Sequence, residues 1–235
     1  MHIVVTVLPR MSNHNDFDLM RHHSELNLEF CYAPSTLPSC DLIFIPGSKN
    51  TREDLEFLKF NWGDDIARHL RYGGKVFGVC GGLQMLGETI DDLDGVEGPG
   101  GVSDGLGYLP IRSALTESKT LKQVKGMLTL HGEPSLVNGY EIHCGLTQGD
   151  CRTLFESADG ACLGFVSDDG QVAGSYWHGL FEEVPALNQL VGWLGKSLDG
   201  DSSENMAEKQ QRSFDRLAKS FEENIEMNEL MKYFY

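Results

Sequence analysis

The sequence predicts an α/β fold in which helices flank a mostly parallel central sheet. Short apolar runs rich in β-forming residues recur at 2–8, 28–33, 41–47 and 75–81. Stretches with helical spacing lie between them, and strands that alternate with helices are typical of a parallel sheet covered on both faces. The chain has 235 residues, 40% of them hydrophobic and 23% charged, so it is long enough for one large globular domain.

The stretch between the third and fourth runs has the clearest helical spacing. Its apolar residues recur at intervals of three or four or their multiples, with charges around them: Leu55, Leu58, Ile66 and Leu70. In parallel sheets, sites form at the carboxyl ends of strands. Gly47 and Cys80 both lie at such ends, which makes the loops after 41–47 and 75–81 the expected site.

The chain changes character after Gly95. The segment 94–110 holds six glycines in 17 residues, which predicts a long irregular connection. Further β-like runs follow, several of them joined by Asp-Gly or Asn-Gly turns that favour hairpins. They are YLPIRSAL, VKGMLTL, VNGYEIHCG, ACLGFV and QVAGSYWHG. We interpret them as antiparallel additions to the same sheet and not as a separate domain.

The chain becomes helical from about Ala186. We expect residues 1–200 to form the domain and residues 201–235 to form a helical extension packed on it. The extension carries apolar residues at helical spacing and aromatic residues to its last position. The apolar positions are Phe214, Leu217, Ala218, Phe221 and Ile225.

Composition excludes several classes of function. The net charge of −16 disfavours a nucleic-acid binder, which needs a basic surface. No apolar run approaches the roughly 20 residues that span a bilayer, and the first residues read as a strand and not as a signal peptide. The six cysteines form no CxxC pair and suit neither a zinc site nor a disulfide framework. We therefore expect a cytoplasmic protein with reduced thiols, no metal and no cofactor of its own.

The heptapeptide GVCGGLQ, residues 78–84, is the strongest chemical signal in the chain. A strand that turns sharply into a helix holds its turn residue in a strained conformation with an exposed side chain, and neighbouring glycines relieve the clashes. The N–H groups at the new helix start can stabilise an oxyanion, and the helix end favours a thiolate. Cys80 is therefore the candidate nucleophile. The alternative is a small buried cysteine at a tight turn.

A thiol nucleophile needs a general base, and His178 is the best placed of the eight histidines. It stands at the end of a β-like run, beside a glycine and before a helix, so it belongs to a loop at a sheet edge. For an isolated histidine, a hydrogen-bonded structural role would be the better interpretation.

Several motifs together resemble the glutamine amidotransferase domain of cobyric acid synthases. They are PRMSNHNDFDLM, FIPGSKNTREDLEFL, VFGVCGGLQMLG, VEGPGGVSDGLGYLP, NGYEIHCGLT and GSYWHGLFE. The resemblance covers nearly the whole chain and implies a class I glutamine amidotransferase fold, which is flavodoxin-like. It also implies that Cys80 attacks the side-chain amide of glutamine, and that His178 accepts the thiol proton and protonates the departing ammonia.

The resemblance places further residues around the nucleophile. Backbone N–H groups of Gly47 or Ser48 and of Gly81 would form the oxyanion hole, and Gln84 is expected in the same oxyanion and substrate-binding set. The loop PGSKN can at the same time begin a helix capped by Asn50 or Thr51.

The third catalytic residue is left open. Class I amidotransferases commonly have a glutamate two residues after the histidine, but Leu180 stands there. Asp16 aligns with an acidic residue proposed for that role in a related cell-wall amidotransferase, and Glu141 is the competitor. His143 is expected to support the site and not to act as the base.

The resemblance also implies a partner. In full cobyric acid synthases an ATP-binding half activates the corrinoid carboxylates, and no Gly-x-x-x-x-Gly-Lys-Ser/Thr motif occurs in this sequence. We expect glutamine as substrate, and a separate synthetase domain or protein that supplies the ATP, magnesium and corrinoid chemistry. Two alternatives stay open. One is the glutaminase subunit of a lipid-linked cell-wall amidotransferase, against which Leu146 argues because that relative has arginine there. The other is a truncated, non-catalytic remnant.

Overall fold

The structure is a computed structural model that describes residues 1–156, 164–198, 206–226 and 232. Its central sheet has the strand order β11-β13-β14-β6-β4-β1-β3. These strands are β1 (His2–Thr6), β3 (Asn27–Cys31), β4 (Leu42–Ile45), β6 (Lys75–Val79), β11 (Arg152–Thr153), β13 (Gly164–Val166) and β14 (Val172–Ser175). The pairs from β3 to β14 are parallel, and β13 and β11 continue the sheet antiparallel at one edge. The predicted mostly parallel sheet is confirmed.

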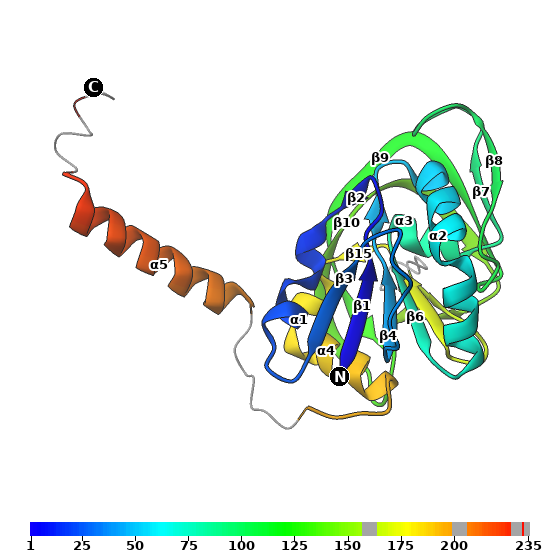
Figure 1. Cartoon of the computed structure of the whole chain (residues 1–235). Helices are drawn as coiled ribbons and strands as arrows, with labels where there is room; N and C mark the ends of the chain where they lie inside the picture. The colour runs from blue at the N-terminus through cyan, green and yellow to red at the C-terminus, as the bar shows by residue number, and fades with distance from the viewer. Residues whose placement is uncertain (157–163, 199–205, 227–231, 233–235) are drawn as a thin grey trace.

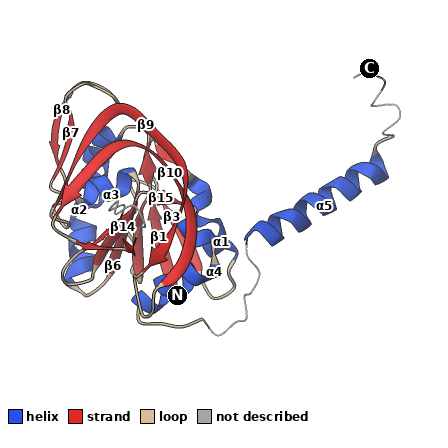
Figure 2. Ribbon diagram, turned by 180° about the vertical axis from the view of Figure 1, so that it is seen from behind, coloured by secondary structure: helices blue, strands red, loops and turns tan. Residues whose placement is uncertain are grey.

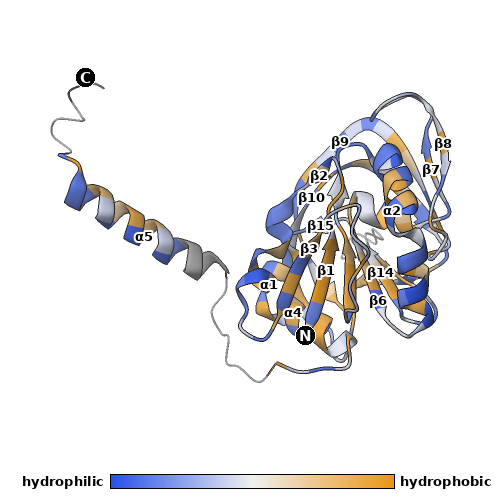
Figure 3. Cartoon of the chain, viewed as in Figure 1, coloured by the Kyte–Doolittle hydropathy of each residue, from blue (hydrophilic) through white to orange (hydrophobic). Residues whose placement is uncertain are grey.

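Helices lie on both sides of this sheet (Figure 1). One side carries α2 (Thr51–Arg71) and α3 (Gly81–Leu86). The other side carries η1 (His14–Phe17), α1 (Asp18–His22), η2 (Leu180–Glu182) and α4 (Val184–Trp193). Because both faces are covered, the inner strands are rich in apolar residues: all four residues of β4 are buried, and β1 is drawn largely in orange in Figure 3.

An aromatic cluster joins the sheet to the helices on the second side. The ring of Phe44 from β4 meets Phe17 from η1 at 5.4 Å and Phe181 from η2 at 5.8 Å, both edge to face. Phe77 from β6 meets Phe181 at 5.1 Å. Edge-to-face pairs are favourable beyond the area they bury, so this cluster fixes η1 and η2 over the carboxyl half of the parallel strands.

The runs YLPIRSAL, VKGMLTL and VNGYEIHCG belong to a second sheet, so their predicted placement on the first sheet is wrong. The second sheet has the order β15-β10-β9-β7-β8, with β12 paired to β9. Its strands are β7 (Thr89–Asp92), β8 (Gly101–Asp104), β9 (Ile111–Leu128), β10 (Ser135–Gly149), β12 (Phe155–Glu156) and β15 (Trp177–His178). The run ACLGFV contributes β13, which is antiparallel in the first sheet as predicted, and QVAGSYWHG contributes β14 to the first sheet and β15 to the second. The free edge of β6 is already occupied by β14, which pairs with it in parallel, so the long β9–β10 hairpin cannot add there. Figure 2 shows this hairpin arching across the molecule.

The glycine-rich segment 94–110 is more ordered than its composition predicts. β8 pairs antiparallel with β7. The Asp92 carboxylate accepts hydrogen bonds from the backbone N–H groups of Val96 and Glu97, at 2.6 and 3.1 Å. Arg52 donates to the carbonyl of Pro99 at 2.6 Å and to the hydroxyl of Ser103 at 3.0 Å. Side-chain anchors of this kind are not visible in composition.

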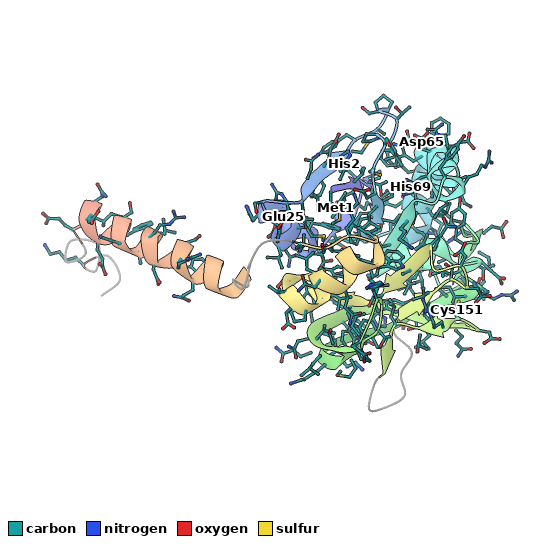
Figure 4. All side chains as sticks on the ribbon, turned by 90° about the horizontal axis from the view of Figure 1, so that it is seen from below. Met1, His2, Glu25, Asp65, His69 and Cys151 are labelled. Carbon is teal, nitrogen blue, oxygen red and sulfur yellow. The ribbon has the colours of Figure 1, made fainter. Side chains whose placement is uncertain are left out.

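The C-terminal helix α5 (Met206–Asn224) stands away from the domain (Figure 4). Its described residues 211–224 are exposed, including Phe214 at 63% and Phe221 at 49%. The apolar spacing therefore does form one face of a helix, but the described residues of that face are not buried on the domain, and the packing of 201–235 stays a prediction. The spacing of apolar residues in the sequence predicts that a helix has an apolar face, but it does not identify the surface that covers this face. Within the described ranges, no helix is both long and apolar enough to cross a bilayer.

Two glycines allow α3 to lie directly on the strands that end beneath it. A Cβ added at Gly82 would come within 2.0 Å of the Ile45 carbonyl oxygen of β4. A Cβ added at Gly78 would come within 2.6 Å of the Gly82 backbone. Since backbone atoms cannot rotate away, only glycine fits at these two positions.

We expect Gly82→Ala to destabilise the fold by several kcal/mol, because overpacking against backbone typically costs about 1–3 kcal/mol and occasionally more. Urea unfolding followed by circular dichroism measures the loss. Gly63→Ala is the matched control: Gly63 lies inside α2 with nothing within 4 Å of an added Cβ, so alanine there should stabilise by about 0.5–1 kcal/mol. Equal stability of the two variants would contradict the close contact.

Candidate active site

Cys80 occupies a strained turn between β6 and α3. Its backbone has φ 52° and ψ −108°, and it is the N-cap residue of α3. A non-glycine residue with positive φ is uncommon and costly, and it persists only where the surroundings impose it. The Cys80 N–H donates to the Ser175 carbonyl at 2.8 Å, and its carbonyl accepts from Gln84 at 3.2 Å. The sulfur lies 3.7 Å from the carbonyl oxygen of Ile142.

The loop after β4 lies against this turn. β5 (Gly47–Ser48) pairs with β2 (Met11–Ser12). A Cβ at Gly47 would lie 3.7 Å from the Cys80 Cβ and 3.4 Å from the His178 Cε1, and one at Gly81 would lie 3.0 Å from the Ser48 nitrogen. The backbones of Gly47, Ser48 and Gly81 therefore meet beside Cys80, where the sequence places the oxyanion donors. Any side chain at Gly47 would enter the space between Cys80 and His178.

The helix that follows this loop is capped by Asn50, one of the two expected residues. The Asn50 side chain accepts from the Glu53 N–H at 3.2 Å. Ser48 donates from its hydroxyl to the buried Asp54 carboxylate at 2.6 Å and accepts from the Asn50 N–H at 3.0 Å. These bonds fix the loop that would supply the oxyanion donors, so its N–H groups need no reorganisation during a reaction.

His178 and Asp16 form a buried pair beside Cys80. The Nδ1 atom of His178 lies 2.7 Å from Asp16 Oδ2, and the other carboxylate oxygen accepts from the Gly179 N–H at 2.8 Å. His178 is 1% exposed and Asp16 5%. The carboxylate thereby sets the ring orientation and leaves Nε2 as the nitrogen available for proton transfer.

The charge state of His178 follows from these contacts. Burial disfavours the imidazolium, but hydrogen bonds to Asp16 and to Cys80 outweigh burial and raise the pKa of His178 to about 10. At neutral pH the imidazole is therefore protonated, and a positive charge faces the Cys80 sulfur.

Asp16 reaches the site through a second strained turn. Asn13 precedes η1 with φ 52° and ψ 47°, in the left-handed region that asparagine tolerates better than most residues. This turn directs η1 back toward β15. Of the two residues that the sequence leaves open for the third role, Asp16 is the one that the structure places against His178.

Glu141 and His143 form a separate buried pair on β10. The Nε2 atom of His143 lies 3.3 Å from Glu141 Oε2, and its Nδ1 lies 2.9 Å from the Gly145 carbonyl oxygen. Lys122 approaches the other Glu141 oxygen at 3.6 Å. These contacts brace β10 near its bulge between His143 and Gly145, which agrees with a supporting position for His143.

Gln84 lies in α3, four residues after Cys80. Its side chain is buried and donates to the Tyr176 hydroxyl at 2.9 Å, while its oxygen accepts from the Thr51 hydroxyl at 3.4 Å. Both ends of the amide are therefore occupied within the protein. This arrangement braces α3 against α2 and β14, and a direct contact of Gln84 with substrate stays a prediction.

Three further groups belong to the site and do not stand out in the sequence. The Ile142 carbonyl faces the Cys80 sulfur, and a main-chain oxygen has no sequence signature. The Tyr176 hydroxyl, which accepts from Gln84, also forms a hydrogen bond with the Thr147 hydroxyl at 2.5 Å. The Tyr140 ring stacks on His178, with centroids 5.4 Å apart and planes inclined by 26°. The register that pairs Tyr140 with His178 is known only from the structure.

The chain matches one protein family over most of its length. Residues 2–186 match the CobB/CobQ-like glutamine amidotransferase domain. Cobyric acid synthase from Vibrio parahaemolyticus is 42% identical over 234 residues, which is 99% of this chain and 48% of that protein. Cobyric acid synthase from Photobacterium profundum is 44% identical over 233 residues, covering 98% and 47%. The chain thus spans about half the length of these curated relatives.

Solved structures share the fold at low identity. A crystal structure described as glutamine amidotransferase aligns with a TM-score of 0.61 and 17% identity, covering 81% of this chain and 98% of that one. PurLQS from Thermotoga maritima aligns with a TM-score of 0.57 and 15% identity, covering 83% and 95%. The predicted class I glutamine amidotransferase fold is confirmed.

We expect Asp16→Asn to lower the pKa of His178, because the Asp16 hydrogen bond is one of the contacts that raise it. Removing a carboxylate partner typically shifts a neighbouring pKa by roughly one to three pH units. NMR titration of the His178 ring, assigned with His178→Asn, measures the change. Asp18→Asn is the control, since Asp18 lies at the start of α1 and pairs with Arg21 at 3.6 Å. An unchanged His178 midpoint in Asp16→Asn would contradict the pairing.

Proposed function

The chain belongs to the CobB/CobQ-like glutamine amidotransferase domain family, and on that premise we propose that it hydrolyses glutamine with Cys80 as nucleophile and delivers the ammonia to an amidation reaction. The observation that carries the proposal is the arrangement in which His178 lies between Cys80 and Asp16 and contacts both. It begins at a cysteine with positive φ at a helix N-terminus and ends at a buried carboxylate 2.7 Å from the histidine.

In the first half of the proposed reaction, the Cys80 sulfur attacks as a thiolate paired with the imidazolium of His178. A carbon–sulfur bond forms at the side-chain carbonyl carbon of glutamine, and the carbonyl π electrons move to oxygen. Backbone N–H groups of Gly47 or Ser48 and of Gly81 stabilise that oxyanion. The oxyanion collapses, the carbon–nitrogen bond breaks, and the His178 proton goes to the nitrogen that departs as ammonia. The γ-glutamyl thioester and a neutral His178 remain.

The second half returns the site to its starting state. Neutral His178 accepts a proton from water as the oxygen attacks the thioester carbonyl. Collapse of this second tetrahedral intermediate breaks the carbon–sulfur bond and releases glutamate. The thiolate and the imidazolium are regenerated, so the net reaction is glutamine plus water to glutamate plus ammonia. Asp16 orients the ring and stabilises the imidazolium throughout.

The ammonia is proposed to amidate carboxylates of a cobyrinic acid diamide in cobalamin biosynthesis, as the names of the relatives suggest. A synthetase domain or protein with ATP and magnesium would activate those carboxylates. Since this chain spans about half of its relatives' length, the synthetase is sought in a separate protein or in a longer form of the same polypeptide. The need for ATP and for reduced Cys80 favours the cytoplasm as the place of reaction.

We expect Cys80→Ala to abolish both glutamine hydrolysis and covalent labelling by a glutamine-mimicking electrophile, because Cys80 is the one cysteine among the described residues that lies at a strand-to-helix turn. Intact-mass spectrometry measures the label. Cys144→Ala and Cys151→Ala are the controls and should keep both properties. Burial raises the pKa of Cys144, which makes its thiol less reactive. Labelling of Cys80→Ala at the wild-type rate would refute the assignment.

We expect this chain alone to hydrolyse glutamine weakly and to amidate nothing when ATP, magnesium and a corrinoid acid are present. Ammonia must meet an activated carboxylate before it escapes to solvent, and we identify no group in this chain that would activate one. Adding an ATP-dependent synthetase domain should raise glutaminase activity and yield the amide. Mass spectrometry of the corrinoid is the measurement. An ATP-dependent amide formed by this chain alone would show that it holds a synthetase site.

A further inference from the structure

We propose that Tyr140 is a positioning residue for the imidazole of His178. Its ring fixes the plane of the imidazole, and its hydroxyl ties that plane to the turn that carries Asp16. The inference deepens the proposed function and rests on it, because it concerns the histidine assigned there to proton transfer.

The first step is the stack itself. Tyr140 on β10 and His178 on β15 are directly paired across antiparallel strands, so their side chains project from the same face of the sheet. Their centroids are 5.4 Å apart and their planes nearly parallel. A cation within about 6 Å of an aromatic centroid is attracted by the ring face. The Tyr140 ring therefore favours the protonated form of His178 as well as its orientation.

The second step is the contact with Asn13. The Asn13 side-chain amide donates to the Tyr140 hydroxyl at 3.2 Å. Asn13 is the left-handed residue that turns the chain into η1, and Asp16 follows three residues later. Burial raises the pKa of Tyr140, so the phenol is neutral and its oxygen accepts this bond at neutral pH. Tyr140 thus contacts the His178 imidazole through its ring and the turn before Asp16 through its hydroxyl oxygen.

The third step is the close packing of the Tyr140 ring on one side and its open groove on the other. Gly179 has φ +70°, and a Cβ added there would lie 3.4 Å from the Tyr140 Cε1. The ring therefore overlies both His178 and the residue whose N–H binds Asp16. On its outer side Tyr140 lines an open groove of about 800 Å³ between the β9–β10 hairpin and η2. Without the ring, the imidazole would face this groove.

The test separates the ring from the hydroxyl by comparing Tyr140→Leu, which removes both, with Tyr140→Phe, which keeps the ring. Two readouts are used: the glutaminase kcat and KM, and the pH midpoint of Cys80 alkylation by iodoacetamide, followed by mass spectrometry. Leu121→Ala is the matched control, because Leu121 lines the same groove at 72% exposure and lies across the hairpin from Ile142. It should leave both readouts unchanged.

For Tyr140→Leu we expect kcat to fall by about three- to tenfold, the range that loss of a cation–π contact gives. KM for glutamine should stay within about twofold, since no substrate contact is removed. The alkylation midpoint should move to higher pH, because the thiolate loses part of the positive charge that stabilises it. Tyr140→Phe should keep the wild-type midpoint.

The hydroxyl is tested by a double-mutant cycle with Asn13→Gly, which retains the left-handed turn and removes the amide. Tyr140→Phe and Asn13→Gly should each reduce kcat, and the double variant should be no slower than Tyr140→Phe, since that variant already removes the Asn13 bond together with the Asn15 contact of the same hydroxyl. Additive losses would overturn the Asn13 link. This cycle also decides the proposal if Tyr140→Leu does not fold.

His178→Asn separates failure of this inference from failure of the proposed function. If His178→Asn moves the alkylation midpoint while Tyr140→Leu has wild-type midpoint and kcat, the positioning role is refuted and the proposed function stands. If His178→Asn also leaves the midpoint unchanged, His178 does not pair with Cys80, and both are refuted.

Discussion

The close approach of α3 to the ends of β4 and β6 is the constraint on which the rest of the site depends. Gly82 allows the first turn of α3 to lie against the Ile45 carbonyl, and Gly78 allows the same turn to lie over β6. With the helix this close to the sheet, Cys80 adopts a strained conformation with φ 52° and ψ −108°. The loop after β4 then meets the turn directly, since a Cβ at Gly81 would lie 3.0 Å from the Ser48 nitrogen. A helix held farther away by side chains would separate the Gly81 backbone from the loop after β4.

The site is closed by a contact between residues that are 162 positions apart in the chain, Asp16 and His178. Asp16 lies in η1 and His178 ends β15, just before η2, and the aromatic cluster of η1, η2 and the central strands holds these segments together. The described part of the chain has two non-glycine residues with positive φ, Asn13 and Cys80. One precedes the turn that carries the carboxylate and the other is the candidate nucleophile. Backbone strain of this kind costs on the order of 1–3 kcal/mol per residue and persists where packing over-determines it.

The parts of this arrangement that depend on local chemistry could be predicted from the sequence. The turn at Cys80 is specified by a buried strand and flanking glycines, and the cap at Asn50 by an ordinary N-cap pattern. The parts that depend on register could not be predicted. Tyr140 meets His178 only because β10 pairs with β15 in one alignment, and the second sheet exists because β14 takes the edge of β6 that the hairpin would otherwise use. The contacts of Gln84 could not be predicted either, since the hydrogen bonds of its amide with Thr51 and Tyr176 depend on how α3 packs in the fold.

The spread of the site along the chain also has a consequence for biosynthesis. Domains fold as their segments emerge from the ribosome, at about 5–20 residues per second, and His178 emerges roughly a hundred residues after Cys80. Until then the thiol has no imidazolium beside it, and the Ile142 carbonyl and the β14 strand that contacts α3 also emerge only well after Cys80. A nascent chain therefore carries an ordinary cysteine, exposed to no more oxidation or alkylation than any other. The proposed nucleophile therefore meets its histidine only when it is already enclosed, with 8% of the residue accessible to solvent.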